Sequence, residues 1–342
     1  MFFTAILILF AAQPEATAKP PAEPPQPPAP TTADEAITRL AVYDAKVRAL
    51  DWASRVSSPN AKCPPPLSTC RGVLGEDRRY RVIVEMTGVA PDGNCGTDDS
   101  DINFDGAVII TVTHRQKTWL RRGEQFDLWL SHGPPSLLGR GGASQRPVNA
   151  SEQLRGGWHQ TPERRPNGDV SVSALVERQG TVDLIRVTMR PSLQMALVQI
   201  ETMAPVFQYA SKVITASEWT TLNGVALPTK GSVEAFSVAL TEDQAVAIQA
   251  AAKKRGLSNI KAWWPTEPAK LALAREALAE GLKGEKVQVR PSALGHYDVK
   301  VTYNALNEKV VVPPPPKPIE RYTFADDLTG EVVLPGSPKT SP

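Results

Sequence analysis

The stretch that decides the fold is Val213-Ile-Thr-Ala-Ser-Glu-Trp-Thr-Thr-Leu222, then Asn223-Gly224, then Val225-Ala-Leu-Pro-Thr-Lys-Gly-Ser-Val-Glu-Ala-Phe236. Asn-Gly tolerates the two positive φ angles of a type I′ turn, so the flanking runs are predicted to form a β-hairpin. The turn sets the register, which places these residues opposite one another: Leu222 and Val225, Thr221 and Ala226, Thr220 and Leu227, Trp219 and Pro228. Because Pro228 has no N–H to donate, its strand is expected to lie at an edge or to carry a bulge there.

Further strand patterns surround this hairpin. Residues 182–190 and 197–206 precede it, 80–86 forms another apolar run, and 297–303 alternates apolar and polar residues without a break. Consecutive strands joined by short turns are typical of antiparallel sheets. The fold class is therefore predicted as α+β, mainly antiparallel β.

The N-terminus indicates the compartment. An apolar run at 2–12 is followed by Ala16-Thr17-Ala18, the small-residue pattern of a signal-peptidase site, so the mature chain is expected to begin at Lys19 in the periplasm or outside the cell. No Lys or Arg precedes the run, which leaves a buried N-terminal helix as the alternative. The formal net charge of +2 gives no field that would attract nucleic acid.

Two helical regions carry N-terminal capping signals. Thr32 with Glu35 opens a helix expected over 33–55, and Thr241 with Gln244 opens a helical hairpin. The first helix has an apolar stripe at spacings of three and four, which needs a surface to cover. The stripe consists of Ile37, Leu40, Tyr43, Val47 and Leu50.

Composition divides the chain into segments. Of the 32 prolines, many cluster at 19–30 and 313–318, which favours extended spacers. The predicted segments are a signal peptide at 1–18, a Pro-rich spacer at 19–32, a curved β-sheet domain at 33–240, a helical hairpin at 241–284, C-terminal strands at 285–312 and a Pro-rich tail with a short extended segment at 313–342.

Three cysteines are present. In an oxidising compartment, Cys63 and Cys70 are close enough in sequence to form a local disulfide, and this is the pairing we predict. A bridge from Cys95 to either of them remains the alternative.

A short acidic segment resembles the start of a calcium loop. Asp101, Asn103 and Asp105 alternate before Gly106, as oxygen ligands do in such loops. Val112 stands where the later bidentate acid is expected, which makes a solvated turn the competing interpretation.

Motifs of catalysis are missing from the sequence. It contains no H-E-x-x-H, G-x-S-x-G or Walker pattern, and its four histidines share no ligand spacing. A non-enzymatic protein without a cofactor is therefore expected.

The chain resembles the LolA/LppX-type lipoprotein-carrier superfamily, particularly its exported planctomycete-type members. The resemblance rests on the strand segment Val187-Thr-Met-Arg-Pro191 and on Asn223-Gly224-Val225 followed by Pro228, and it covers roughly 33–238. It implies a curved, incompletely closed β-barrel with helices in its mouth, and a concave face that holds acyl chains. The helical hairpin and the strands after it are additions to that pattern.

The resemblance implies a function. The expected activity is binding of a lipid or an acylated protein in the concavity, with the N-terminal helix as a cover. The candidate ligand-binding residues on the helix and the concave face are Leu40, Tyr43, Val47, Leu50, Trp119, Trp129 and Trp219. The alternative is an envelope interaction module whose core is filled and which binds a protein partner rather than a ligand.

Overall fold

The structure is a computed structural model that describes residues 28–59, 61–89, 93–122, 137–138, 149–178, 181–204, 206, 209–257, 268–308, 310–318 and 321–335. The predicted signal peptide at 1–18, most of the spacer at 19–32, and Trp129 lie outside these residues.

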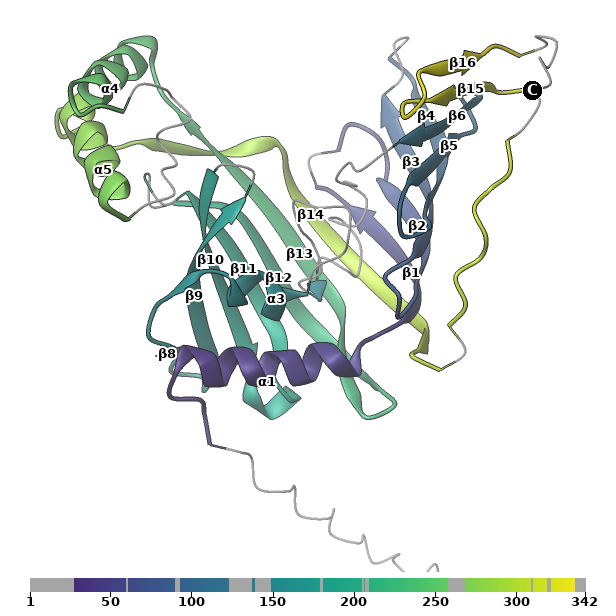
Figure 1. Ribbon diagram of the computed structural model, residues 1–342, viewed down its shortest axis with the longest axis horizontal. Coiled ribbons are helices and arrows are strands. Elements are labelled where there is room, and N and C mark those ends of the chain that lie inside the picture. Colours follow the sequence, from purple (N-terminus) through teal and green to yellow (C-terminus); the bar gives the residue numbers. More distant parts are fainter. Residues whose placement is uncertain are drawn as a thin grey trace, which may run out of the picture.

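One sheet dominates the molecule, with two short helices against it and a helical hairpin at one end (Figure 1). In the N-terminal half the elements are α1 (Ala33–Lys46), β1 (Leu50–Ser57), β2 (Ser68–Leu74), β3 (Tyr80–Val89), β4 (Cys95–Phe104), β5 (Ile109–Thr113), β6 (Thr118–Arg122), α3 (Ala150–Arg155), β7 (Trp158–His159) and β8 (Glu163–Arg164). Next come β9 (Val170–Arg178), β10 (Thr181–Arg190), the 3₁₀ turn Pro191–Leu193, β11 (Ala196–Ala204), β12 (Tyr209–Leu222), β13 (Val225–Ala239), α4 (Glu242–Lys254), α5 (Pro268–Leu282), β14 (Gln288–Leu306), β15 (Thr323–Asp326) and β16 (Glu331–Val333).

The strand order is β16-β15-β6-β5-β4-β3-β2-β1-β14-β13-β12-β11-β10-β9-β7, with β8 also paired to β9. Every pair is antiparallel except β15 with β6, which is parallel. Among the described strands β16 and β7 stand at opposite ends of this order, so the barrel is incompletely closed. Figure 1 shows the sheet bent into two halves, β9–β13 and β1–β6, with α1 lying across the first. The predicted fold class is confirmed.

The hairpin at 213–236 forms as predicted. Asn223 and Gly224 take φ angles of 50° and 74°, and the register pairs Leu222 with Val225 and Trp219 with Pro228. The register shifts on either side of Glu218, directly beside Pro228. Because β13 is a central strand, the missing N–H of Pro228 is accommodated by a bulge and not by an edge position.

The first helix is shorter than expected. Thr32 caps it, with its side-chain oxygen accepting the Glu35 N–H, but α1 ends at Lys46 and not near residue 55. From Leu50 the residues are buried alternately, as in a strand with one face on the core, and they pair with β2 and β14 on either side. Two neighbouring strands therefore override the helical spacing of residues 47–50.

Strand β14 joins the two halves of the sheet. It pairs with β13 on one side and with β1 on the other. Residues 285–312, expected as additional C-terminal strands, thus contribute one long strand at the centre of the sheet. Within the described residues, this strand pairs on both sides with strands of 33–240.

The helical hairpin is attached through the far ends of β13 and β14 (Figure 1). Thr241 and Gln244 form the predicted capping box. The two helices are in close contact at Gly281, where an added Cβ would lie 2.5 Å from the Cα of Ile248. Their contact has its own apolar core, separate from that of the sheet.

The predicted Cys63–Cys70 disulfide is wrong. The bond joins Cys63 to Cys95, with Cα atoms 5.7 Å apart, and so ties the loop before β2 to the start of β4. Cys70 lies inside β2 with its side chain in the core, where the pleat turns it away from the loop. Sequence proximity favoured the wrong pair because a strand begins between the two cysteines.

Removing this bond tests the pairing. Cys63→Ser and Cys95→Ser are each expected to lower the free energy of unfolding by about 2–4 kcal/mol, because the bond closes a loop in the unfolded chain. The double variant is expected to lose no more than either single one. Non-reducing peptide mapping should recover a peptide that joins Cys63 to Cys95, in the wild-type protein and in a Cys70→Ala control. A peptide that joins Cys63 to Cys70 would contradict the structure.

Candidate functional site

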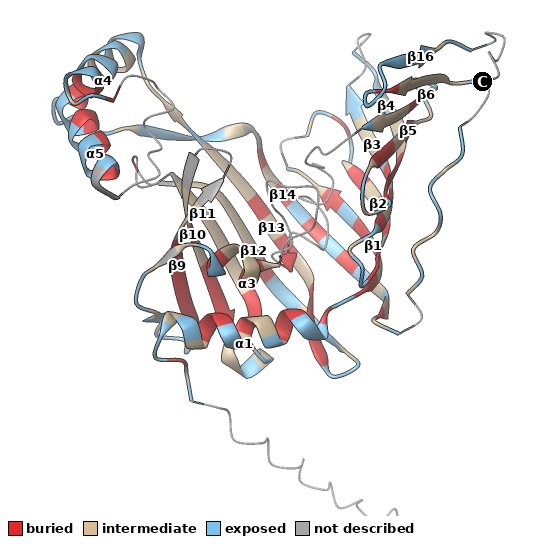
Figure 2. Cartoon of the chain, in the orientation of Figure 1, coloured by how far each residue is buried: buried red, intermediate tan, exposed pale blue. Residues whose placement is uncertain are grey.

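The candidate site is the inner face of the sheet, which is the face that α1 covers. Apolar side chains from both halves form one continuous cluster there. In the half under α1 they come from β9 to β13, and in the other half from β1 to β5. Figure 2 shows that the buried parts of β9 and β10 lie towards α1, where the helix covers them.

Across β1 to β4 the inner face grades from apolar to polar. Residues paired across neighbouring strands share a face, so the register gives four rows. The row nearest the end of α1 is wholly apolar, and the farthest row carries a carboxylate. From apolar to polar the rows are Leu50-Leu74-Tyr80-Phe104, Trp52-Gly72-Val82-Ile102, Ser54-Cys70-Val84-Ser100 and Val56-Ser68-Met86-Asp98.

Three polar atoms on this face are buried and have no hydrogen-bond partner among the described residues. They are the indole Nε1 of Trp52, the hydroxyl of Ser54 and Oδ1 of Asp98. Trp52 and Ser54 are neighbours on one strand face, and their exposed fractions are only 1% and 4%. Burying an unpaired polar group costs about 1–3 kcal/mol, so such groups need an explanation.

Gly72 explains how the Trp52 side chain fits. A Cβ at Gly72 would lie 2.2 Å from the indole ring, so only glycine leaves room for it in the row. The sequence analysis missed Trp52 and Ser54 because it continued the helix through them. The alternation Leu50-x-Trp52-x-Ser54-x-Val56 was the signal that could have found both.

Helix α1 covers the inner face with its apolar stripe. Leu40 and Tyr43 have exposed fractions of 0% and 1%, and the Tyr43 hydroxyl donates to the Ala226 carbonyl at 2.7 Å. Val42, on the opposite side of the helix, is 56% exposed. The stripe predicted from spacing is therefore the covering surface.

Polar contacts fix the C-terminal end of α1. Asn307, at the end of β14, accepts the N–H groups of Arg48 and Ala49 and donates to the Lys46 carbonyl at 2.7 Å. A pocket of about 130 Å³ lies between this end of the helix and the turn joining β2 to β3. The helix is thus anchored at the point where the chain turns into β1.

A buried contact joins α1 to α3. The Asp44 carboxylate accepts the backbone N–H of Ser151 at 3.1 Å and its hydroxyl at 2.5 Å. Ser151 lies in the first turn of α3, where backbone N–H groups have no partners within the helix. We infer that the two helices form one cover over the sheet.

Leu137 and Leu138 also reach the inner face, each 2% exposed. A Cβ at Gly231 of β13 would lie 2.6 Å from a methyl carbon of Leu137 and 2.4 Å from the Thr215 carbonyl oxygen. The absence of a side chain at Gly231 therefore lets Leu137 approach the sheet backbone.

The structure divides the predicted ligand-binding residues. Leu40 and Tyr43 lie on the cover, Val47 caps the end of α1, and Leu50 begins β1; all four belong to the inner-face cluster. They are brought together as expected.

The two predicted tryptophans that the structure describes lie in different places. Trp119 belongs to a separate apolar cluster on the opposite, outer face, where it stacks on Phe324 with ring centroids 4.8 Å apart. Trp219 is half-buried and packs against the inner-face cluster, and the Arg190 guanidinium lies over its ring at 5.1 Å. The assignment of Trp119 to the concave face is therefore wrong, because the alternation of β6 turns its ring outward. Trp219 contacts the inner-face cluster, as predicted. The prediction for Trp129 falls outside the described residues.

The calcium-loop residues form a strand instead of a loop. Asp101 and Asn103 are buried in β4, and the Asp101 carboxylate accepts two hydrogen bonds from Arg81, at 2.9 and 2.5 Å. Asp105 accepts the N–H groups of Ala107 and Val108 in the following turn. The described residues contain no group of three or more His, Cys, Asp or Glu side chains placed to hold a metal ion.

Charged residues cover the outer face of β9 to β11. Arg190 holds the buried Asp169 carboxylate through two hydrogen bonds, at 2.9 and 3.1 Å, and these bonds raise the pKa of Arg190. Arg186 and Arg165 both approach Glu201, at 3.5 and 3.7 Å. On the outer face, charges of opposite sign thus pair with one another, whereas the inner face is apolar.

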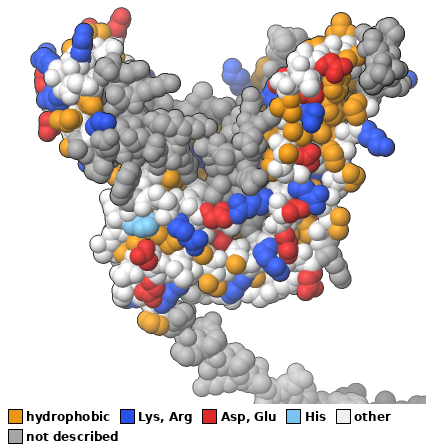
Figure 3. Space-filling view, viewed as in Figure 1, with side chains coloured by type: hydrophobic (Ala, Val, Ile, Leu, Met, Phe, Trp, Pro, Cys, Tyr) orange, Lys and Arg blue, Asp and Glu red, His pale blue; other side chains and the backbone are white. Residues whose placement is uncertain are grey.

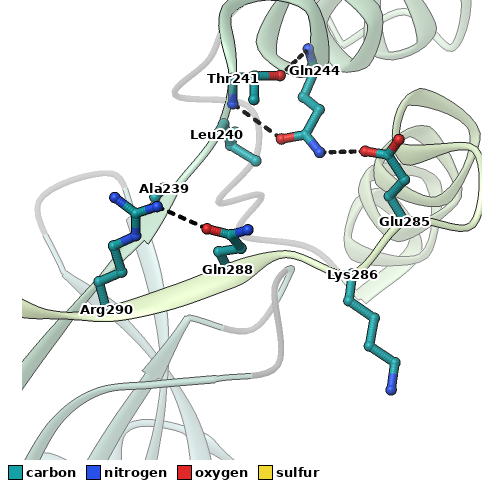
Figure 4. Close-up of a pocket in the computed structure, with 8 residues that line it drawn as sticks. All are labelled: Ala239, Leu240, Thr241, Gln244, Glu285, Lys286, Gln288 and Arg290. Atoms are coloured by element: carbon teal, nitrogen blue, oxygen red, sulfur yellow. Dashed lines mark hydrogen bonds between the residues drawn. The ribbon is translucent and has the colours of Figure 1, made fainter.

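A polar pocket of about 540 Å³ lies where the helical hairpin meets the sheet (Figure 4). Within it the Gln244 side chain donates to Glu285 at 2.7 Å and Arg290 donates to Gln288 at 2.8 Å. Polar side chains that pair with one another thus line this pocket, unlike the inner face.

Figure 3 shows basic and acidic side chains interspersed over the lower surface, and hydrophobic ones concentrated over β3–β6.

Within the described residues, no helix is both long and apolar enough to cross a membrane.

Neither a protein-family model nor a curated protein sequence matches the chain. Solved structures similar to it include a LolA superfamily protein from Nitrosomonas europaea, at 10% identity and a TM-score of 0.38, covering 84% of this chain and 96% of that one. A DUF1329 family protein from Desulfovibrio piger matches at 8% identity and a TM-score of 0.33, covering 60% of this chain and 87% of that one. LprF from Mycobacterium bovis matches at 12% identity and a TM-score of 0.24, covering 51% and 88%. The predicted kinship with planctomycete-type members stays a prediction, and the half-barrel itself rests on the strand order described above.

Proposed function

We propose that this protein is an exported, non-enzymatic binder of an amphiphilic ligand, a lipid or the acyl chain of an acylated protein, on the inner face of its half-barrel. The observation that carries the proposal is the pair of unpartnered donors, Trp52 Nε1 and Ser54 Oγ, set in an otherwise apolar face. An ester or amide carbonyl between them would accept their hydrogen bonds, which the protein leaves unmade.

The gradient across β1 to β4 supports the same ligand. An acyl chain would lie over the Leu50 and Trp52 rows, a carbonyl at Ser54, and a polar head at the row that ends in Asp98. Burial of apolar surface supplies the affinity and the few polar groups set the orientation, as in most small-molecule sites. The covering helices α1 and α3 would then exclude water from the chain.

Export is part of the proposal. The signal-peptide pattern at 1–18 and the Cys63–Cys95 disulfide both suit an oxidising compartment outside the cytoplasm. The alternative of an interaction module with a filled core predicts that no lipid accompanies the purified protein.

A single substitution tests the polar part of the site. Ser54→Ala is expected to keep the free energy of unfolding or to raise it by up to about 1 kcal/mol, because it removes a buried unpaired hydroxyl. It should nevertheless weaken binding of a fluorophore-labelled long-chain fatty acid ester several-fold. Fluorescence titration and thermal unfolding of the same sample measure both effects.

Ser171→Ala is the matched control. The Ser171 hydroxyl lies on the outer face and is hydrogen-bonded to Thr188 at 2.9 Å, so its loss should lower stability and leave ester binding unchanged. Native mass spectrometry of the wild-type protein should show copurified lipid. If the spectrum shows no lipid and the protein binds no ester, the proposal is wrong and the interaction module is favoured.

A further inference from the structure

The feature that carries a further inference is the C-terminal strap, residues 310–318, which crosses the outer face of the β1–β6 half (Figure 1). Side chains from three strands donate hydrogen bonds to its carbonyls. Arg81 of β3 reaches Pro314 at 3.3 Å, Asn103 of β4 reaches Pro313 at 3.4 Å, and Trp119 of β6 reaches Pro316 at 3.1 Å.

From Pro313 onward the burial pattern of the strap repeats every three residues, and Val312 before it is also half-buried. Pro313 and Pro316 are half-buried against the sheet, whereas Pro314, Pro315 and Lys317 are exposed. Three residues per turn is the repeat of a polyproline II helix, whose carbonyls project outward and have no internal partners. An indole N–H that donates to such a carbonyl beside an apolar surface is how aromatic grooves recognise proline-rich segments.

Two of the three donors are held in position by residues outside the strap, and the third, Asn103, is buried with the strap in place. Asp101 fixes Arg81 through two hydrogen bonds, and Phe324 stacks on the Trp119 ring. Asn103 is 1% exposed. The recognition surface is therefore preorganised, which lowers the entropic cost of binding.

The strap leaves one polar atom of this surface without a hydrogen bond. Asn103 Oδ1 is buried without a donor among the described residues, and four successive prolines, 313–316, have no N–H to offer it. Beside Pro313 an open pocket of about 390 Å³ is lined by Arg71, Ile83 and Asn304 among others, and Ile83 is 47% exposed. A proline-rich segment with non-proline residues between its prolines would fit better.

We propose that the outer face of β3, β4 and β6 is a polyproline-recognition surface, filled in cis by the strap, and that its occupant in trans is the spacer 19–30 of a second copy of this chain. The spacer contains Pro21-Ala22-Glu23-Pro24, with prolines three apart and two N–H groups between them. One N–H would satisfy Asn103 Oδ1, and Glu23 carries the charge complementary to Arg71 in the pocket. The surface thus links copies of the protein through their spacers.

The experiment uses the full chain with Pro313–Pro316 replaced by Gly-Ser-Gly-Ser, which empties the surface. Fluorescent peptides of residues 310–318 and 19–30 are titrated against this variant and against wild type. Both peptides should bind the emptied variant, the 19–30 peptide at least as tightly, and bind wild type about tenfold or more weakly, because a tethered strap competes at high effective concentration.

Trp119→Phe in the emptied variant should weaken both peptides about fivefold, the effect of one lost hydrogen bond. Trp219→Phe is the matched control, because the Trp219 indole N–H has no partner, and it should leave binding unchanged. No binding by an emptied variant with a cooperative unfolding transition would overturn the recognition surface. Binding of the 310–318 peptide alone would overturn the spacer as occupant.

A second measurement needs no emptied surface. In the full-length Trp119→Phe variant, a loosened strap should speed hydrogen exchange at Thr323 and Asp327, whose N–H groups donate to Lys117 and Arg121 carbonyls of the β6 edge. Unchanged exchange at both amides would show that Trp119 does not hold the strap, and would contradict the surface proposed here.

Discussion

Replacing Arg190 by methionine is expected to lower the free energy of unfolding by about 3 kcal/mol, one of the largest losses available from a single polar side chain here. Asp169 is 2% exposed, and its carboxylate takes both hydrogen bonds from Arg190. Removal of one partner of a buried pair leaves an uncompensated charge, which costs about 3–5 kcal/mol. We expect the lower end because the Arg190 side chain is itself 32% exposed. Urea unfolding at neutral pH measures the loss.

Arg186→Met is the matched control on the same strand face. Its partner Glu201 is 18% exposed and also has Arg165 within 3.7 Å, so the loss should be much smaller. The double variant Asp169→Ala with Arg190→Met should recover part of the loss, because no unpaired charge then remains. Equal losses for Arg190→Met and Arg186→Met would show that the Arg190–Asp169 pair contributes no more to the free energy of unfolding than a surface ion pair does.

The parts of the fold predicted from sequence are those with short-range causes. The 213–236 hairpin has its register set by Asn223-Gly224, and Thr241 with Gln244 caps α4 as a local pattern requires. Both features depend on residues within a few positions of each other, so no knowledge of the distant chain is needed.

The errors came where two local patterns compete or where a distant partner decides. Residues 47–50 continue a helical spacing, yet Leu50 also begins an alternating run, and only the neighbouring β2 and β14 favour the strand. The sequence pattern made Asp101 a candidate calcium ligand, but its carboxylate accepts a hydrogen bond from Arg81 of the adjacent strand. Likewise, the pairing of Cys63 follows from where β4 begins.

Mainly the cover of the candidate site was predicted from the sequence. The covering stripe of α1 was visible as a spacing, but the face it covers is assembled from strands far apart in sequence. Trp52 and Ser54 meet Gly72 and Cys70 only through the β1–β2 register, and β14 joins them to β13. Trp119 lies on the outer face because it pairs with Val112 of β5 there, a register that composition does not reveal.

Leu40→Ala is expected to raise uptake of an apolar fluorescent probe about tenfold or more, because it weakens the cover and not the sheet. Leu40 is fully buried on the side of α1 that faces the sheet, and truncation of such a leucine costs about 2–5 kcal/mol. If α1 and α3 lift as one cover, that cost falls on the closed form and shifts the population towards the open one, where each 1.4 kcal/mol is a factor of about ten. The fall in global stability is then limited to the free energy of opening.

Leu227→Ala is the comparison that separates a cover from a core. Leu227 is equally buried on the inner face but belongs to β13, so its truncation should lower global stability by the full 2–5 kcal/mol or so, without raising probe uptake through an opened cover. Val42→Ala, on the exposed side of α1, should change neither quantity. A Leu40→Ala protein that loses as much stability as Leu227→Ala and takes up no probe would show that α1 is a permanent part of the core. In that case the half-barrel would stand and the ligand-binding function would not.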